Sequence, residues 1–303
     1  MSAARPRILC LGDAIVDFVG ERPGATLTEV DRFSPHFGGV AANVALVAAR
    51  DGAPVALAGG AGDDAWGRHL RARLQEARVD VSRFVLVAGM ETPLAFVTCA
   101  EDGEPTYHLR GPQPDLVSRA LGDDVEGVVA GAGGLFLSTN TLVGEAERTV
   151  SMRAHAAARQ HDLPIVFDAN LRLHRWRSRT DAAASANACV RGALLVRANR
   201  AEAALMTGEQ DPERAATALV KAGARLVVLT LGPDGAILRG ALRATAPGVP
   251  CRPLNTAGAG DVLTGTLLAR LALSGFYDSS VAAGLPDAIE AAARACERWG
   301  AVD

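Results

Sequence analysis

The chain has 303 residues, and its 31 Lys and Arg are balanced by 34 Asp and Glu, which gives a formal net charge of −3. A nucleic-acid-binding domain usually carries a basic excess, so binding to DNA or RNA is not expected. No apolar run reaches the about 18 residues of a membrane span, and the first residues do not resemble a secretion signal. We therefore expect a cytoplasmic globular protein with no nucleic-acid or membrane partner.

The lysine and cysteine content excludes several classes of functional site. Lys221 is the only lysine, and it lacks the flanking motifs of a Walker A lysine, a protein-kinase lysine or a pyridoxal Schiff base. The five cysteines are widely spaced and form no C-x-x-C pair, which argues against a disulfide framework or a structural zinc site. The positive charge of any phosphate site must therefore come from arginine, backbone dipoles or a metal ion.

From residue 8 onward, short apolar runs alternate with helical patterns. The predicted strands are residues 8–11, 55–58, 135–138, 165–168, 194–197 and 226–230. The predicted helices are residues 43–50, 65–77, 145–160 and 212–222. Several of these strands are apolar at successive positions, as is typical of strands that are buried on both faces. The alternation predicts an α/β fold with a mostly parallel central sheet flanked by helices on both faces.

Two segments do not fit this alternation. Residues 14–37 have strand character without a crossover helix, and residues 91–110 are typical of a hairpin around Asp102-Gly103. We expect these two insertions to form a small β layer over one edge of a single domain that spans residues 1–303. The exposed strand edge of such a layer is a candidate homodimer interface.

Polar and glycine-rich residues follow most of the predicted strands. They are Gly12, Asp13 and Asp17, residues 59–63, Asp168 and Asn170, Asn199 and Glu202, and Leu231 with Gly232. Ligands of open α/β sheets bind beyond the carboxyl ends of the strands, so these residues predict a polar cleft. A dinucleotide oxidoreductase is not expected, because the first strand lacks the G-x-G-x-x-G fingerprint.

The sharpest feature is the run Gly258-Ala259-Gly260-Asp261, which opens an apolar helical pattern. Small residues let consecutive backbone N–H groups converge at a helix N-terminus, where the helix dipole also favours an anion. Asp261 then places a carboxylate beside whatever approaches a phosphate bound there. An Asp that accepts the proton of an attacking hydroxyl is a recurring part of phosphoryl-transfer sites.

The stretch 255–261, NTAGAGD, resembles the D-T-x-G-A-G-D signature of the PfkB (ribokinase-like) sugar kinases. Further motifs of that family follow the same order along the chain. They are G-[DE]-x-x-x-D at 12–17, G-G-x-x-x-N at 38–43, G-x-D-x-x-G at 62–67, N-x-x-E at 199–202 and T-L-G-x-x-G at 230–235. The resemblance covers essentially the whole chain, and it implies a ribokinase-like fold with a β-sheet lid and an ATP-dependent sugar kinase activity.

The resemblance also implies a role for each matching residue. Asp261 would be the general base, and the backbone of residues 257–260, with Gly258, Ala259 and Gly260, would be the anion hole. The residues that would contact the sugar are Asp17, Gly38, Gly39, Asn43, Arg110, Asp168 and Asn170. The residues that would line the nucleotide site are Asn199, Thr230, Gly232, Gly235, Thr256, Ala257, Gly258 and Gly260. Asn199 and Glu202 would organise Mg²⁺ through water, and Arg172 would neutralise γ-phosphate charge or contact an acidic substrate.

Two stretches favour fructose as the acceptor. Residues 168–176 resemble the fructokinase pattern D-x-N-x-R-x-x-L-W, with Arg175 in place of Leu, and residues 107–116 resemble Y-R-x-x-x-A-D-L, with Pro114 in place of Ala. The first pattern is shared with 2-keto-3-deoxygluconate kinases, and lid residues set acceptor choice. A 2-keto-3-deoxygluconate kinase or a nucleoside kinase of the same family is therefore an alternative, and a catalytically silent sugar- or nucleotide-binding regulator is a more remote one.

Asn255 departs from the family signature. It replaces the Asp that opens D-T-x-G-A-G-D, and in relatives that negative charge helps to hold a monovalent cation. We therefore expect weak dependence on K⁺. His36 and His108 lie in the predicted lid, where they are candidates for contact with substrate.

Overall fold

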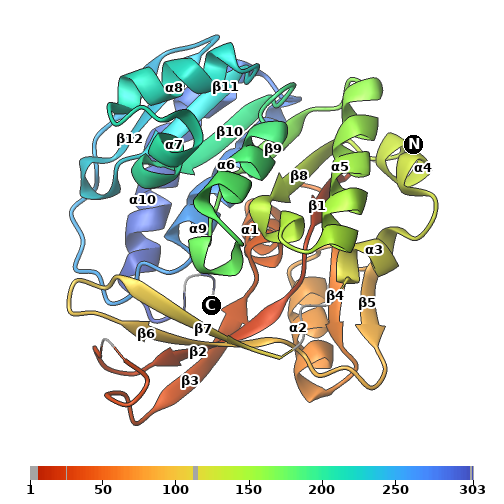
Figure 1. The fold of residues 1–303 in the computed structure, drawn as a ribbon, viewed down its shortest axis with the longest axis vertical. Coiled ribbons are helices and arrows are strands. Elements are labelled where there is room, and N and C mark those ends of the chain that lie inside the picture. Colours follow the sequence, from red (N-terminus) through yellow and green to blue (C-terminus); the bar gives the residue numbers. More distant parts are fainter. Residues whose placement is uncertain (1–5, 25, 112–114, 301, 303) are drawn as a thin grey trace.

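The computed structural model describes residues 6–24, 26–111, 115–300 and 302. Its largest element is a nine-stranded sheet (Figure 1). In spatial order its strands are β13 (Ala244–Ala246), β12 (Ala236–Gly240), β11 (Leu226–Thr230), β10 (Leu195–Asn199), β9 (Ile165–Asp168), β8 (Gly134–Ser138), β1 (Ile8–Leu11), β4 (Val55–Gly62) and β5 (Phe84–Val87). The strands from β11 to β5 pair in parallel, whereas β12 and β13 add an antiparallel edge.

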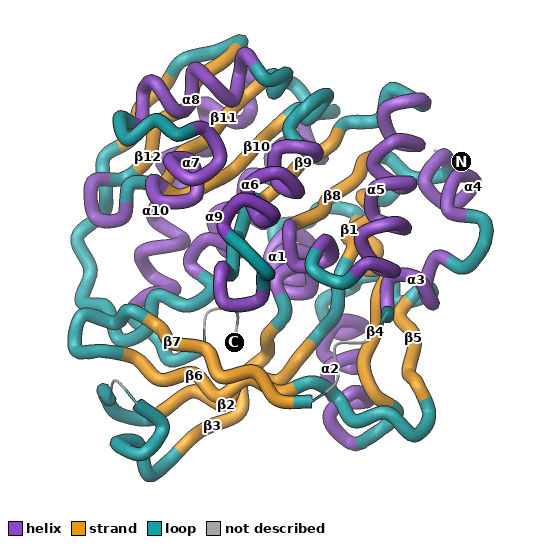
Figure 2. Tube along the Cα trace, viewed as in Figure 1, coloured by secondary structure: helices purple, strands orange, loops and turns teal. Residues whose placement is uncertain are grey.

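Helices cover both faces of this sheet. One face packs against α1 (Val40–Arg50), α2 (Ala65–Glu76), α9 (Ala259–Ser274) and α10 (Asp278–Cys296). The other face packs against α3 (Leu116–Leu121), α4 (Val125–Ala130), α5 (Glu145–Gln160), α6 (Arg179–Ala188), α7 (Arg200–Thr207) and α8 (Pro212–Lys221). Each face buries its own apolar cluster, and Figure 2 shows the strands between the two helical layers. None of the helices that the structure describes is long and apolar enough to cross a membrane.

A second sheet comes from the two predicted insertions. Its order is β3 (Phe33–Gly38), β2 (Ile15–Gly20), β6 (Leu94–Cys99) and β7 (Pro105–Arg110). The two outer pairs are antiparallel, but β2 and β6 are parallel. This sheet lies below the carboxyl ends of the parallel strands in Figure 1. The predicted fold class, a mostly parallel sheet between helices with a small β-sheet lid, is confirmed.

The second sheet is joined to the loop that precedes α9. Val19, Val97 and Cys99 pack in one apolar cluster with Ala257 of that loop. At the β6–β7 turn, the carbonyl oxygen of Gly103 accepts hydrogen bonds from the Thr256 backbone N–H at 2.9 Å and from its hydroxyl at 3.2 Å. The lid therefore packs directly against the loop that precedes Asp261.

The glycine-rich stretch at residues 59–63 differs from its prediction as a cleft loop. Residues 59–62 belong to β4, which pairs with β5. A Cβ atom on Gly59 would lie only 1.7 Å from the carbonyl oxygen of Gly12. Glycine is needed there because two backbones approach closely, not because a ligand is bound.

Candidate active site

A cavity lies between the carboxyl ends of the large sheet and the second sheet. The large sheet contributes the loops after β1, β8 and β9 and the start of α9, and the second sheet contributes residues of β2, β3 and β7. Asp261, Asp17 and Arg172 all line it. The sequence predicted a polar cleft at this edge of the sheet, and some of the predicted residues line the cavity: Asp17, Gly39, Asn43, Arg110, Arg172, Ala257, Gly258 and Asp261.

Asp261 is held in the first turn of α9 and is only 4% exposed. Its two carboxylate oxygens each accept a hydrogen bond from a side-chain amide. Asn43 Nδ2 donates to Oδ2 at 2.8 Å, and Asn170 Nδ2 donates to Oδ1 at 3.2 Å. Burial raises the pKa of Asp261 to about 6, although the bond from Asn43 opposes this rise. A carboxylate with a pKa near neutrality is suited to accept a proton at physiological pH.

The helix N-terminus beside Asp261 offers free backbone donors. Gly258 has φ 76°, in the left-handed region, and forms the N-cap of α9. No described residue accepts a hydrogen bond from the N–H of Gly258 or Gly260. The N–H of Ala257 is instead occupied by Asn255 Oδ1 at 2.9 Å, which differs from its predicted place in the anion hole. The N–H of Ala259 donates to the Thr256 carbonyl oxygen at 3.3 Å, so of the predicted anion hole only Gly258 and Gly260 keep N–H groups that could meet an anion.

Predicted sugar contacts lie opposite Asp261 in the cavity. Asp17 on β2, Gly39 and Asn43 line it, whereas Gly38 does not. A Cβ atom on Gly38 would come within 2.5 Å of the Asp17 carboxyl carbon, so this glycine leaves room for that carboxylate. Asn43 bonds Asp261 through its amide nitrogen, and no described partner reaches its buried Oδ1.

Arg172 brings positive charge to the cavity from the loop after β9. Its guanidinium carbon lies 4.6 Å from the ring centroid of Tyr107, a residue of the lid strand β7. Such a cation–π contact lets an aromatic ring hold a buried cation without neutralising it. Burial opposes the charged form, but Tyr107, Asp261 and other acidic groups outweigh it and raise the pKa of Arg172. Tyr107 entered the prediction only through the fructokinase pattern, and its contact with Arg172 was not predicted.

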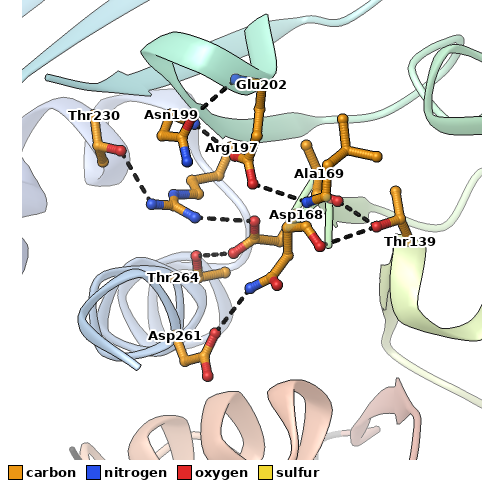
Figure 3. Close-up of polar contacts among 11 residues, drawn as sticks. Thr139, Asp168, Ala169, Arg197, Asn199, Glu202, Thr230, Asp261 and Thr264 are labelled. Atoms are coloured by element: carbon orange, nitrogen blue, oxygen red, sulfur yellow. Dashed lines mark hydrogen bonds and ion pairs between the residues drawn. The ribbon is translucent and has the colours of Figure 1, made fainter. Parts of the chain in front are cut away.

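Asp168 differs from its prediction as a sugar contact. It is 0% exposed and does not line the cavity. Its Oδ1 accepts a hydrogen bond from Arg197 Nη1 at 3.2 Å, and its Oδ2 accepts one from Thr264 at 2.7 Å. Figure 3 shows this carboxylate between Arg197 and Thr264 of α9. Asn170 lies beside the same network, with φ 34°, and contacts Asp261 rather than lining the cavity.

Arg197 is the residue that the sequence analysis missed. It is 7% exposed in the middle of β10, and its Nη2 donates to the Thr230 hydroxyl at 3.0 Å (Figure 3). A Cβ atom on Gly260 would lie 2.6 Å from Arg197 Nη1, so the guanidinium lies directly against the anion site. The sequence did contain a signal, which is an arginine within an otherwise apolar strand. A charge at such a position predicts a buried partner of opposite charge.

Asn199 and Glu202 form a capping box at the start of α7. Asn199 Oδ1 accepts the Glu202 N–H, and Glu202 Oε2 accepts the Asn199 N–H, both at 2.8 Å. Glu202 Oε1 also accepts the Leu171 N–H at 2.8 Å, next to Arg172. These bonds do not fit direct coordination of Mg²⁺ by Glu202, and no cluster of three or more acidic, His or Cys side chains in the described ranges could hold a metal. The pair instead fixes two loops of the site.

The predicted nucleotide residues separate into two groups. Thr230 ends β11 beside Asn199 of β10, and Gly232, with φ 63°, begins the short 3₁₀ turn η3 (Gly232–Asp234) next to it. A Cβ atom on Gly232 would meet nothing within 4 Å, which leaves an open surface there. Gly235 differs, because a Cβ atom on it would lie 2.2 Å from the Ala246 carbonyl oxygen. Gly235 shapes the turn into β12, and Thr256 is bonded to the lid turn.

The remaining lid predictions are met in part. Arg110 and His36 line the cavity, and His108 lies on β7 next to the strand positions that do. Residues 112–114 of the predicted fructokinase pattern lie outside the described residues.

The pKa of Asp261 predicts a pH dependence. A general base acts only when deprotonated, so kcat/KM should rise as pH increases through about 6 and level off above about 7. The measurement is a pH–rate profile at saturating ATP. Asn43→Ala removes the hydrogen bond that lowers this pKa, so its midpoint should move to higher pH even if its rate is lower. A profile that is flat from about pH 5 to about pH 8 would contradict this role.

Comparisons with known proteins agree with this geometry. The model of the pfkB family carbohydrate kinases matches residues 5–301. Fructokinase-1 of Zea mays is 31% identical over 274 residues, which make up 89% of this chain and 84% of that protein. Among solved structures, the fructokinase of Vibrio cholerae O395 with bound fructose, ADP and calcium ion has a TM-score of 0.84 and 26% identity, covering 99% of this chain and 96% of that one. A PfkB protein from Polaromonas sp. JS666 has a TM-score of 0.82 and 27% identity, with 97% of both chains covered.

Proposed function

Because the chain belongs to the pfkB family of carbohydrate kinases, we propose that it transfers the γ-phosphate of ATP to a hydroxyl of fructose. The family makes it a phosphotransferase that acts on a sugar hydroxyl. The observation that carries the proposed mechanism is the position of Asp261, a buried carboxylate between the free N–H groups of Gly258 and Gly260 and the sugar-facing residues of the cavity.

In this mechanism Asp261 accepts the proton of the attacking sugar hydroxyl. The N–H groups of Gly258 and Gly260 donate to the charge that develops on the transferring phosphate. Arg172 and the more deeply buried Arg197 add positive charge on either side. The lid strands cover the cavity, and exclusion of water there would prevent hydrolysis of ATP.

Mg²⁺ would enter with ATP and neutralise triphosphate charge. Each carboxylate oxygen of Glu202 already accepts one backbone N–H group, which favours contact with the ion through water over direct coordination. We infer that Asn199 and Glu202 act on the ion only through its water shell, which Mg²⁺ commonly retains. Their main task is to hold the loops that carry Arg172 and Thr230.

Fructose is supported over the alternatives by two observations. The curated relatives of Zea mays and Oryza sativa are fructokinases, each 31% identical to this chain. Asp17, Asn43 and Arg172 give the cavity both acceptors and donors, as an uncharged polyhydroxy ligand requires. An acidic acceptor such as 2-keto-3-deoxygluconate would have to place its carboxylate near Arg172 or Arg110.

The test is ADP release with Mg-ATP and a panel of fructose, 2-keto-3-deoxygluconate, ribose and adenosine. We expect the highest kcat/KM with fructose. A higher kcat/KM with another sugar of the panel would show that fructose is not the preferred acceptor, but the kinase mechanism would still hold. Binding of ATP and sugar without turnover would instead identify a catalytically silent binding protein.

Asn255 predicts little activation by K⁺. Its Nδ2 donates to the Trp299 carbonyl oxygen at 2.6 Å, and its Oδ1 accepts the Ala257 N–H at 2.9 Å. A carboxylate could keep the second bond but would face the Trp299 carbonyl without a proton or cation between them. The wild-type rate should change by less than about twofold between K⁺ and Na⁺, whereas Asn255→Asp should become dependent on K⁺. A large, selective effect of K⁺ on the wild type would overturn this prediction.

A further inference from the structure

The cavity continues beyond the residues assigned to the sugar. On the side of α5 it is lined by Asp13, Asn140, Glu147 and Arg175, which we call the far subsite. These residues come from the loop after β1, the 3₁₀ turn η1 (Thr139–Leu142), the first turn of α5 and the 3₁₀ turn η2 (Leu173–Arg175). None of them has a part in the proposed phosphoryl transfer.

Arg175 is the cation of the far subsite. It stands where the fructokinase-like pattern has Leu, and its Nη1 donates to Asn140 Oδ1 at 2.7 Å. Burial lowers the pKa of Arg175, while the nearby carboxylates of Asp13 and Glu147 act in the opposite direction. A guanidinium at a position that a leucine would fill therefore adds a charged donor to the lining of this end of the cavity.

The same subsite presents acceptors. Glu147 Oε1 accepts the Val117 N–H at 2.7 Å, and the backbone N–H of Ser118 also favours its charged form. Burial raises the pKa of Glu147 to about 7, and the adjacent Asp13 and Asp115 add to this rise. No described residue donates a hydrogen bond to the Asp13 carboxylate, and the buried Asn140 Nδ2 has no partner in the described part of the chain. Donors and acceptors therefore alternate around one end of the cavity.

This alternation identifies the class of ligand. A ligand carboxylate would be attracted by Arg175 but repelled by Asp13 and Glu147. A ligand ammonium group would be attracted by the two carboxylates but repelled by Arg175. A hydroxyl both donates and accepts, so it can use Arg175 and Asn140 together with Asp13 and Glu147. We propose that the far subsite binds the hydroxyl groups of a second sugar unit, so that the preferred acceptor is a fructose-containing disaccharide. This rests on the proposed sugar kinase function.

The experiment compares fructose with two disaccharides, one substituted at carbon 1 (fructosyl-fructose) and one at carbon 6 (glucosyl-fructose). 1-Amino-1-deoxyfructose and 2-ketogluconate, which carry a cation and a carboxylate at carbon 1, complete the panel. The variants are Arg175→Leu and the isosteric Asp13→Asn, with Arg153→Leu as matched control, since Arg153 is exposed on α5 outside the cavity. Turnover is measured by ADP release, and binding is measured separately by titration calorimetry.

One disaccharide should have a kcat/KM at least equal to that of fructose. Arg175→Leu and Asp13→Asn should each lower that value by about tenfold, the loss expected for one polar contact, while fructose changes by less than about twofold. Equal losses with fructose, failure of both disaccharides to bind, or preference for the charged analogues would each overturn the proposal. Disaccharide binding that depends on Arg175, with ADP released from fructose alone, would overturn the disaccharide as acceptor, whereas such binding with no ADP from any sugar would reject the kinase function on which the proposal rests.

Discussion

Asp261→Asn should lower kcat for the sugar acceptor by about 10³-fold, within the range that general-base catalysis contributes. The asparagine keeps the size of the side chain but cannot accept the proton of the attacking hydroxyl. Binding of sugar and ATP should persist, because Asp17, Asn43 and the backbone donors remain in place. The measurement is steady-state ADP release together with calorimetric titration of both substrates.

The fold should tolerate this change. Asn43 and Asn170 both point their amide nitrogens at Asp261, and no described residue bonds the buried Oδ1 atom of either side chain. A flip of one amide would therefore supply an acceptor for the new NH₂ group. The matched control is Asp287→Asn on α10, which removes a carboxylate that pairs with Arg270 on the surface. Equal rates for Asp261→Asn and this control would show that Asp261 is not the base.

Arg197→Met should reduce the free energy of unfolding by about 3–5 kcal/mol, as expected when one partner of a buried ion pair is removed. Asp168 has no exposure, so without Arg197 its carboxylate would keep only the bond from Thr264. Thr230 would also lose its bond from the guanidinium. The measurement is the urea dependence of unfolding, compared with that of the wild type.

Arg239→Met is the control for loss of a buried arginine. Arg239 is also 7% exposed, but its partner Glu213 has a side chain that is 48% exposed and can be hydrated after the change. A smaller loss is expected there. Adding Asp168→Asn to Arg197→Met should recover part of the stability, because the uncompensated charge is removed. If Arg197→Met is no less stable than Arg239→Met, the ion pair does not hold the site together.

Apolar periodicity was sufficient to predict the framework of the fold. Fully buried parallel strands such as β8 and β9 have continuous apolar runs, and the hairpin of β6 and β7 has a turn signal at Asp102-Gly103. The edge strands β12 and β13 were not predicted. β13 has only three residues at the border of the sheet, too few for a periodic signal, and β12 follows β11 as a second short apolar run without a helix between them.

The proposed catalytic residues were easier to predict from the sequence than the buried residues that hold them in place. Asp261 and the glycines beside it are recognisable because one short motif carries both the proposed donors and the proposed base. Arg197 contacts residues of β9, β11 and α9 that lie 29 to 63 residues away, and no local pattern reports such contacts. Asp168 was misassigned for the same reason, since its motif gives its position at a strand end but not the direction of its side chain.

Glu202 illustrates a third case. The N-x-x-E motif suggested a role near Mg²⁺, but the spacing of three residues is also that of a helix capping box. The structure has the capping box, and the carboxylate also bonds Leu171 on another loop. Only the tertiary contact reveals that this residue links the α7 start to the Arg172 loop.

The most direct test follows phosphorus from ATP into the sugar. The protein is incubated with Mg-ATP and fructose, and phosphorus NMR monitors the products beside an identical sample of Asp261→Asn. The account predicts one sugar phosphate formed in equal amount to ADP by the wild type and almost none by the variant. Release of inorganic phosphate in place of a sugar phosphate, or equal product from both samples, would contradict a sugar kinase in which Asp261 is the base.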